Sequence, residues 1–416
     1  MRRFSWLMLA CLLVFASVSS AQELRVTRAP DDAESVAGIA IAGTEVVLGK
    51  FGLTAIGSDL TADILHFAVG DLAQLSLSPN AVDEVRTLRL YVGGVLFAEV
   101  APHTATGYAP FVTELILPEN YVQHITVTGL FNTVPDGADS GASVFLYFFE
   151  AHALGKATQF TTQVGLIGNR KVVYKTKPII TLPRQLGIKL GAGENPVIRF
   201  TIGADPAGPL AWRGITFQVS PVGADVVAAV DTVAGTTGNV AIRKVETATN
   251  LNIALASSGQ TPFVDGFPNQ GIPSGQSGYI SVVLSNAERI PAGANFTYEF
   301  SLTFRNVSPV AGAAYVSVRA FINETVSAGP GNNLQDLVVR RDNSFVWSDH
   351  SSVAHSDSSP DWANGWGVPG LPSESVVTDN GSGIFQLPPP PPPPTVREER
   401  FIFPKDRWVF FAPVGV

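Results

Sequence analysis

Apolar and polar residues alternate in short runs along the chain from about residue 40 onward. The clearest runs are VVLGKFGLTA, DILHFAV, VRTLRLYV, QHITVTGLF and ASVFLYFF, and clusters of Gly, Pro, Asn or Asp separate them. Alternation is the pattern of a strand with one buried face, whereas a helix needs apolar residues three or four positions apart. Short strands at regular intervals, joined by turn residues, predict an all-β fold.

The order of apolar positions in the first half of the chain recurs in the second half. VRTLRL is matched by IRKVET, QHITVTGLF by NFTYEFSLTF, and ASVFLYFF by AAYVSVRAF. The matched single positions are Phe51, Leu53, Ala55, Leu60, Leu65, Phe67 and Val69 in the first half and Phe200, Ile202, Ala204, Leu210, Ile215, Phe217 and Val219 in the second. The pattern predicts two tandem immunoglobulin-like domains, each an antiparallel β-sandwich, with longer loops in the second.

The first residues, MRRFSWLMLACLLVFASVSSAQ, have the three parts of a secretory signal peptide: two arginines, an apolar run and small residues. Cleavage is expected after Ala21. The apolar run is shorter than the roughly 20 residues that a membrane-spanning helix needs, and no second candidate follows. The only cysteine, Cys11, lies inside this segment, so the mature chain is expected to have no disulfide and no thiolate metal site. Lipid attachment at Cys11 is an alternative interpretation.

The chain therefore divides into four predicted parts. These are a signal peptide (1–21), a first β-sandwich (22–178), a second β-sandwich with a tryptophan-rich closing segment (179–387), and a proline-rich C-terminal tail (388–416). The stretch KTKPIITLPRQLG is expected to connect the two sandwiches. Seven prolines, Pro388 to Pro394, predict a stiff polyproline II rod, and the apolar run from Trp408 to Val416 could form a strand.

The net charge argues against two classes of partner. Only 15% of the residues are charged, and the net charge is -8. Nucleic acid and anionic lipid both favour a basic surface, so neither is an expected partner.

The closing segment, residues 345–373, has the sequence FVWSDHSSVAHSDSSPDWANGWGVPGLPS. In a structural interpretation, Trp347 completes a strand, Trp362 and Trp366 cover the end of the second core, and Asp and Ser side chains hold the turns. A tight turn is expected at Asn364-Gly365.

A binding interpretation of the same segment stays open. Carboxylates would favour calcium and paired imidazoles would favour zinc, although the spacing matches neither H-E-x-x-H nor the twelve-residue calcium loop. Trp362 and Trp366 could stack on sugar rings. The candidate metal ligands are Asp349, His350, His355, Asp357 and Asp361.

No catalytic residue and no required cofactor are predicted. A serine hydrolase would need a G-x-S-x-G turn or a similar nucleophile with an activating histidine, and no such motif accompanies the six histidines. His66 and His124 lie inside alternating strands and are interpreted as ordinary strand residues. Six acidic residues lie by turns or strand ends, which is typical of solvated carboxylates: Asp59, Asp63, Asp83, Glu84, Glu114 and Glu119.

The closing segment resembles a segment found near the end of surface proteins of ultrasmall candidate-phylum bacteria. The shared elements are Trp347-Ser348-Asp349, His355-Ser356, Asp361-Trp362 with Asn364-Gly365, and Gly370-Leu371-Pro372. The stretch VLGKFGLTAIGSDLTADILHFAV is similar to the first strands of those proteins, and the resemblance extends to Leu387. It implies a cell-surface, structural or adhesive protein and implies no chemistry.

Two functions follow as hypotheses. The first is a non-enzymatic, exported structural protein, a subunit of an envelope layer or filament, whose partners are copies of itself or other envelope proteins. The second is an adhesin or carbohydrate-binding module that contacts surface glycans through loops.

Overall fold

The computed structural model describes residues 22–30, 37–70, 83–155, 159–182, 190–227, 239–253, 263–265, 271–310, 313–320, 334, 337, 345–371, 373 and 376–379. All of them belong to one compact unit, Met1–Gly383. The predicted signal peptide and the proline-rich tail lie outside the described residues, and both stay predictions.

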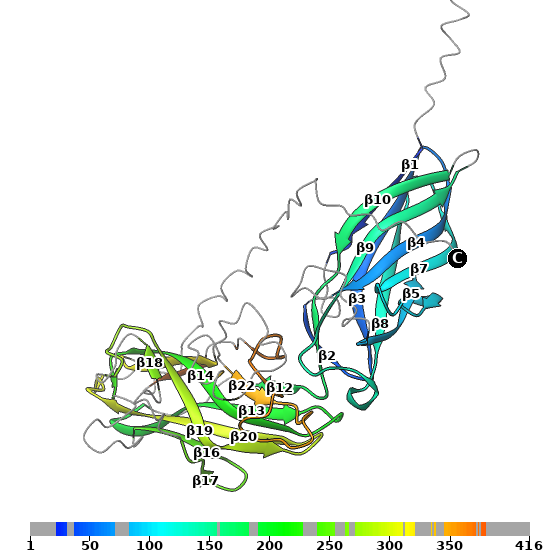
Figure 1. The fold of residues 1–416 in the computed structure, drawn as a ribbon. Coiled ribbons are helices and arrows are strands. Elements are labelled where there is room, and N and C mark those ends of the chain that lie inside the picture. The colour runs from blue at the N-terminus through cyan, green and yellow to red at the C-terminus, as the bar shows by residue number, and fades with distance from the viewer. Residues whose placement is uncertain are drawn as a thin grey trace, which may run out of the picture. The chain divides into compact units, whose positions relative to one another are not determined.

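The first sandwich consists of two sheets (Figure 1). A five-stranded sheet has the order β1 (Glu23–Arg28), β3 (Glu45–Ile56), β8 (Val122–Phe131), β5 (Val85–Val92) and β6 (Val95–Val100). A six-stranded sheet has the order β2 (Gly38–Ile41), β11 (Lys171–Tyr174), β9 (Ser143–Leu154), β4 (Leu60–Gly70) and β7 (Tyr108–Leu117), and β10 (Gln159–Ile167) also pairs with β9. Pairing between named strands is antiparallel except between β2 and β11. A 3-10 turn, η1 (Val134–Asp136), precedes β9.

The second sandwich also consists of two sheets. One has the order β12 (Pro178–Thr181), β13 (Gly193–Ala204), β20 (Asn295–Arg305), β16 (Val240–Lys244) and β17 (Thr249–Asn250), and β15 (Asp225–Val226) pairs with β20. The other has the order β18 (Phe263–Asp265), β19 (Gly278–Ile290), β14 (Leu210–Val222), β21 (Tyr315–Ala320) and β24 (Val376–Asp379). In the same sheet β22 (Phe345–Ser348) pairs with β14 and with β23 (Trp362–Ala363). The predicted fold class, two tandem antiparallel β-sandwiches, is confirmed.

Each sandwich has its own apolar core, built from the inward side of alternating strands. In the first core, the ring centroid of Phe51 lies 5.8 Å from that of Phe67 and 5.2 Å from that of Phe148. In the second core, the rings of Phe200 and Phe217 lie 5.5 Å apart. All five side chains are fully buried, and aromatic pairs at these separations add to the stabilisation that burial alone provides.

The two sandwiches share a strand order. β1-β3-β8-β5-β6 in the first corresponds to β12-β13-β20-β16-β17 in the second, and β4, which pairs with β7 and β9, corresponds to β14, which pairs with β19 and β21. The matched rings Phe51 and Phe67 are packed together as Phe200 and Phe217 are. These similarities support the predicted internal duplication, which stays a prediction.

The stretch between the sandwiches differs from the expected connector. Within KTKPIITLPRQLG, residues 178–181 form the edge strand β12, which pairs with β13. The alternation in PIIT explains this strand, since Pro178 and Ile180 are buried while Ile179 and Thr181 are exposed. Proline is compatible with this position because an edge strand has one side without ladder hydrogen bonds.

Candidate functional site

Asp349 fastens the closing segment to residues far away in the sequence. Its side chain is fully buried, and Oδ2 accepts hydrogen bonds from the Ser140 hydroxyl and the Lys175 backbone N–H, both at 2.7 Å. Oδ1 accepts a third from the backbone N–H of Ser351 at 3.1 Å. Burial raises the pKa of Asp349, while these hydrogen bonds oppose the rise. The geometry is that of a structural carboxylate.

His350, His355 and Asp361 lie together in the closing segment. The two imidazole ring centroids are 3.9 Å apart, and His355 Nδ1 lies 3.0 Å from Asp361 Oδ2. Burial, followed by the neighbouring His355, lowers the pKa of His350 to about 4. Burial by itself would raise the pKa of Asp361, but hydrogen bonds from Ser359 and His355 bring it below its ordinary value.

Asp357 stands apart from the other candidate metal ligands. Its side chain is 63% exposed, and Oδ1 lies 3.2 Å from Nη1 of Arg213. The structure therefore brings together three of the five candidates and separates Asp349 and Asp357 from them. Metal binding by the closing segment stays a prediction.

Trp347 and Trp366 pack with the second core as the structural interpretation expects, whereas Trp362 packs in a small separate cluster with Leu334, Leu337 and Val346. Trp347 lies in β22, is fully buried, and donates its Nε1–H to the carbonyl oxygen of Asn364 at 2.7 Å. Trp362 is 2% exposed and donates to Ser356 O at 2.9 Å. Trp366 is half-buried, with the Arg170 guanidinium 5.0 Å from its ring centroid. The burial of Trp362 argues against a sugar platform made by Trp362 and Trp366, although the prediction itself is untested.

Short side chains hold the turns of this segment as expected. Ser348 Oγ accepts from the His350 N–H at 3.1 Å, and Asn364 Oδ1 accepts from the Trp366 N–H at 3.3 Å. The turn after β23 is closed by a hydrogen bond from Val368 N to Gly365 O at 3.2 Å. Its centre is therefore Trp366-Gly367, two residues later than the predicted centre, and Gly367 supplies the positive φ of 70°.

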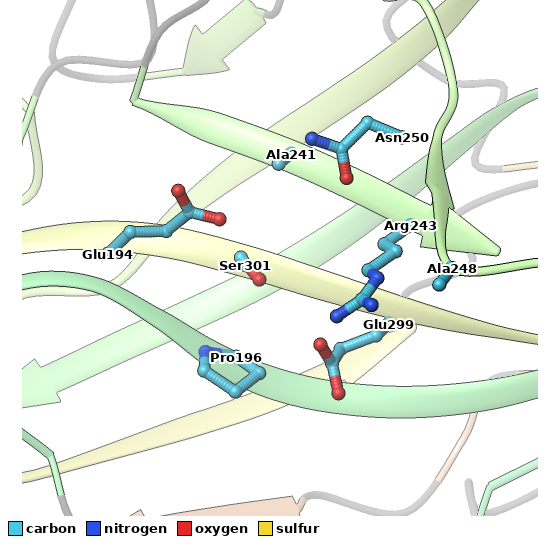
Figure 2. A pocket seen from close by; sticks show the side chains of 8 residues that line it. All are labelled: Glu194, Pro196, Ala241, Arg243, Ala248, Asn250, Glu299 and Ser301. Carbon is cyan, nitrogen blue, oxygen red and sulfur yellow. The ribbon is translucent and has the colours of Figure 1, made fainter. Parts of the chain in front are cut away.

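A pocket lies on the second sandwich, on the sheet that contains β13, β16, β17 and β20. Its volume is about 550 Å³. Figure 2 shows Arg243 and Glu299, which are also cross-strand partners, on its surface. The buried carboxylate of Glu299 already has a cationic partner, since Oε2 lies 2.7 Å from Nη2 of Arg199. The lining residues are Glu194, Pro196, Ala241, Arg243, Ala248, Asn250, Glu299 and Ser301.

A group of potential metal ligands that the sequence analysis did not recognise lies on the six-stranded sheet of the first sandwich. It consists of His66 on β4 and Glu150 and His152 on β9, whose ligand atoms all lie within 4.8 Å of one another. Glu150 Oε2 lies 3.4 Å from His152 Nε2 and 3.9 Å from His66 Nε2. Burial, followed by the neighbouring His152, lowers the pKa of His66.

A β-bulge in β9 brings Glu150 and His152 to the same face of the sheet as His66. The pairing register of β4 and β9 shifts between His66 and Phe67, so that Phe149 is an extra residue on β9. As a result Phe149 and Glu150 are both half-buried, while Ala151 points into the core and His152 returns to the outer face. Bulges commonly change the direction of a side chain beside a functional site. The sequence signal was Glu150-Ala151-His152, whose alternation places both polar groups on one side of a strand.

Large apolar side chains are exposed on the two strands at one end of the first sandwich. On β6, Val95, Leu96 and Phe97 are 70%, 47% and 43% exposed, and on β7 Val112 and Ile116 are 77% and 68% exposed. Within the part of the chain that the structure describes, each of these strands has a pairing partner on one side only.

Among the described residues, no helix is long and apolar enough to cross a membrane.

Comparison with known proteins gives distant structural likenesses only. No protein family and no curated protein matches the chain. The C-terminal domain of the antigen I/II polypeptide BspA of Streptococcus agalactiae is 8% identical, over 72% of this chain and 95% of that chain, with a TM-score of 0.15. The T6 backbone pilin of Streptococcus pyogenes is 9% identical over 70% and 60%, with a TM-score of 0.17. The Enterococcus faecalis MSCRAMM ACE is 10% identical over 73% and 88%, with a TM-score of 0.16. TM-scores this low carry no inference about function.

Proposed function

We propose that the protein is a non-enzymatic, exported structural protein of the cell surface, a subunit that assembles with copies of itself into an envelope layer or filament. The observation that carries this proposal is the set of exposed apolar side chains on β6 and β7. Export rests on the predicted signal peptide.

Strand β6 is the edge that fits a further strand best. An edge strand has unpaired backbone N–H and C=O groups, and an added strand from another chain satisfies them. Strand β7 contains Pro110, which has no N–H and therefore protects an edge. Strand β6, VLFAEV, contains no proline, and three consecutive apolar residues are exposed on it.

The occupant that we propose for β6 is the C-terminal apolar run of a neighbouring copy, Trp408 to Val416. Its sequence, WVFFAPVGV, is apolar enough to cover Val95, Leu96 and Phe97. Seven prolines precede it, and a polyproline II rod of that length spans about 20 Å. Together with residues 395–407, which follow it, such a rod gives the apolar run enough reach to meet a neighbouring copy.

Removal of residues 388–416 tests the proposal. Negative-stain imaging and sedimentation of the mature chain are expected to show layers or filaments, and the shortened chain is expected to stay monomeric. Leu96→Lys with Phe97→Lys should have the same effect, because an apolar strand docked on β6 would have to bury two charged side chains. Val353→Lys is the matched control, since Val353 is fully exposed on a loop of the closing segment.

Assembly of the shortened chain at the same concentration as the intact chain would exclude the tail as the donated strand. A mature chain that stays monomeric at all concentrations would contradict the proposed function. Retention on a glycan array that Trp366→Ala abolishes would favour the alternative, an adhesin or carbohydrate-binding module.

A further inference from the structure

We propose that His66, Glu150 and His152 form a zinc site on the first sandwich, with His66 Nε2, His152 Nε2 and Glu150 Oε2 as ligands and water in the fourth position. The proposal does not depend on the assembly function.

Both distances from Glu150 Oε2 to the histidine nitrogens are near those of a tetrahedral site, and the ligand atoms of the three residues all lie within 4.8 Å of one another. With Zn–N and Zn–O bonds of about 2.0–2.2 Å, neighbouring ligand atoms are about 3.3 Å apart. Glu150 Oε2 and His152 Nε2 are already 3.4 Å apart, and His66 Nε2 is 3.9 Å from the same oxygen. Small rotations of the side chains are therefore enough to accommodate the ion.

An unpartnered buried nitrogen is the second, independent observation. His66 is 8% exposed, and its Nε2 has no hydrogen-bond partner although the atom is buried. Buried polar atoms are nearly always paired with protein or water, so an orphaned imidazole nitrogen beside a carboxylate requires an explanation. A metal ion bound between them would satisfy both groups.

Neighbouring side chains bind His66 Nδ1 and Glu150 Oε1, so His66 Nε2 and Glu150 Oε2 stay available for the ion. The hydroxyl of Tyr108 is hydrogen-bonded to His66 Nδ1, which directs Nε2 toward Glu150. Gln163 donates its Nε2–H to Glu150 Oε1 at 2.6 Å and leaves Oε2 available. Such outer contacts orient the ligands of metal sites. The rings of Tyr108 and Phe149, at 5.6 and 5.7 Å from that of His66, help to bury it.

The ligand types select the metal. Calcium and magnesium prefer sites made entirely of oxygen, whereas two imidazoles and one carboxylate suit zinc. The side chains of Glu150 and His152 are 22% and 21% exposed, so the ion and its water can enter from solvent. The ion would link β4 to β9, which are neighbours in the sheet.

The competing explanation is a metal-free cluster in which Glu150 interacts with two histidines. Zinc titration of the chelator-treated mature chain by calorimetry distinguishes the two. We expect one zinc per chain and a higher melting temperature with zinc present. Glu150→Gln and His152→Ala should each weaken binding by at least 10-fold. His124→Ala, at an exposed histidine on β8, should bind as the unchanged chain does.

Cobalt provides a readout that does not depend on stability. Co²⁺ in a four-coordinate site absorbs visible light strongly, and we expect such a spectrum in the unchanged chain and in His124→Ala but not in His152→Ala. Circular dichroism of each variant establishes that it is folded. The proposal would be overturned if the unchanged chain bound no stoichiometric zinc. It would also be overturned if the folded Glu150→Gln and His152→Ala variants bound zinc as tightly as the unchanged chain does.

Discussion

Glu84 shows how a buried position changes the chemistry of an ordinary acidic residue. The side chain lies at the start of the β5 region and is 1% exposed, and its two oxygens accept hydrogen bonds from the Asp139 N–H at 3.0 and 3.1 Å. Burial is the largest cause of its shift and raises the pKa of Glu84 from 4.5 to about 8, with the nearby carboxylates of Asp139 and Asp83 adding to the rise. From the sequence alone Glu84 was interpreted as a solvated acid, which is wrong, because the turn at residues 132–139 covers it.

Glu84 gives the first prediction, which concerns pH. Between the unfolded pKa of 4.5 and the folded pKa of about 8, the folded state holds a proton that the unfolded state has lost. The free energy of unfolding must therefore fall as pH rises through this window, by at most about 4–5 kcal/mol. Glu84→Gln cannot ionise, so its stability relative to the unchanged chain should be greater at pH 9 than at pH 5. Urea unfolding at the two pH values measures the difference.

Glu114→Gln is the control for this prediction, since Glu114 is exposed on β7. It should have the same pH profile as the unchanged chain. If Glu84→Gln also has that profile, Glu84 does not hold its proton in the folded state.

At the scale of elements, the alternating pattern located the long strands because each of them has one buried face, whereas short strands such as β11 and β22 are buried throughout. The bulges were not predictable in the same way. Whether Phe149 becomes an extra, unpaired residue depends on how β9 pairs with β4. The sequence of β9 alone does not specify that pairing. The position of β12 was missed for a related reason, since its pairing partner β13 decides that a short proline-containing stretch becomes an edge strand.

The docking of the closing segment on β12 gives the prediction at this scale. Ile180 N donates to Pro369 O at 3.0 Å, and Gly370 lies against the same strand with a φ of 89°. A Cβ on Gly370 would lie 1.7 Å from Ile180 O, so Gly370→Ala should detach the segment and destabilise the fold by more than about 2 kcal/mol. Thermal unfolding and limited proteolysis within residues 349–373 measure this effect.

Gly275→Ala is the control that distinguishes the steric clash with Ile180 from the backbone strain of a positive φ. Gly275 has a similar φ of 80°, but an added Cβ would have no atom within 4 Å. Its expected cost is about 1 kcal/mol, without faster proteolysis of the closing segment. Equal effects of the two variants would contradict the docking contact.

At the scale of the whole molecule, the described residues build two large apolar cores with a limited connection between them, and a small third cluster around Trp362. The second core also receives Ile39, Val172 and Tyr174, which come from strands β2 and β11 of the first sandwich. The hydrogen bonds of Asp349 to Ser140 and Lys175 add to this connection. The strength of the coupling decides whether the sandwiches unfold together or one at a time.

Tryptophan placement makes this coupling measurable. Residues 22–182 contain no tryptophan, so in a mature chain that carries Trp408→Phe the fluorescence reports Trp212, Trp347, Trp362 and Trp366 only. Phe148→Ala in the first core and Phe217→Ala in the second should each cost about 3–5 kcal/mol. The two are a matched pair, because each ring is fully buried and has a stacked neighbour with its centroid 4.2 Å away.

Phe148→Ala is expected to lower the melting temperature measured by circular dichroism. The melting temperature measured by tryptophan fluorescence should fall by less, because the tryptophans lie outside the first sandwich. Phe217→Ala is expected to lower the fluorescence transition. Equal shifts of both signals in both variants would mean that the two sandwiches unfold as one unit.

The sequence by itself determined the all-β class and the two sandwiches. In the closing segment it also determined that Trp347 lies in a strand and that short polar side chains hold the turns. These depend on which residues alternate and which residues form turns, and both are local properties of the chain. The tertiary structure alone decided that Glu84 is buried, that Asp349 bonds to Ser140 and Lys175, and that His66 meets Glu150 and His152. Each of these results depends on residues that are far apart along the chain, so only the pairing and packing of strands could bring them together.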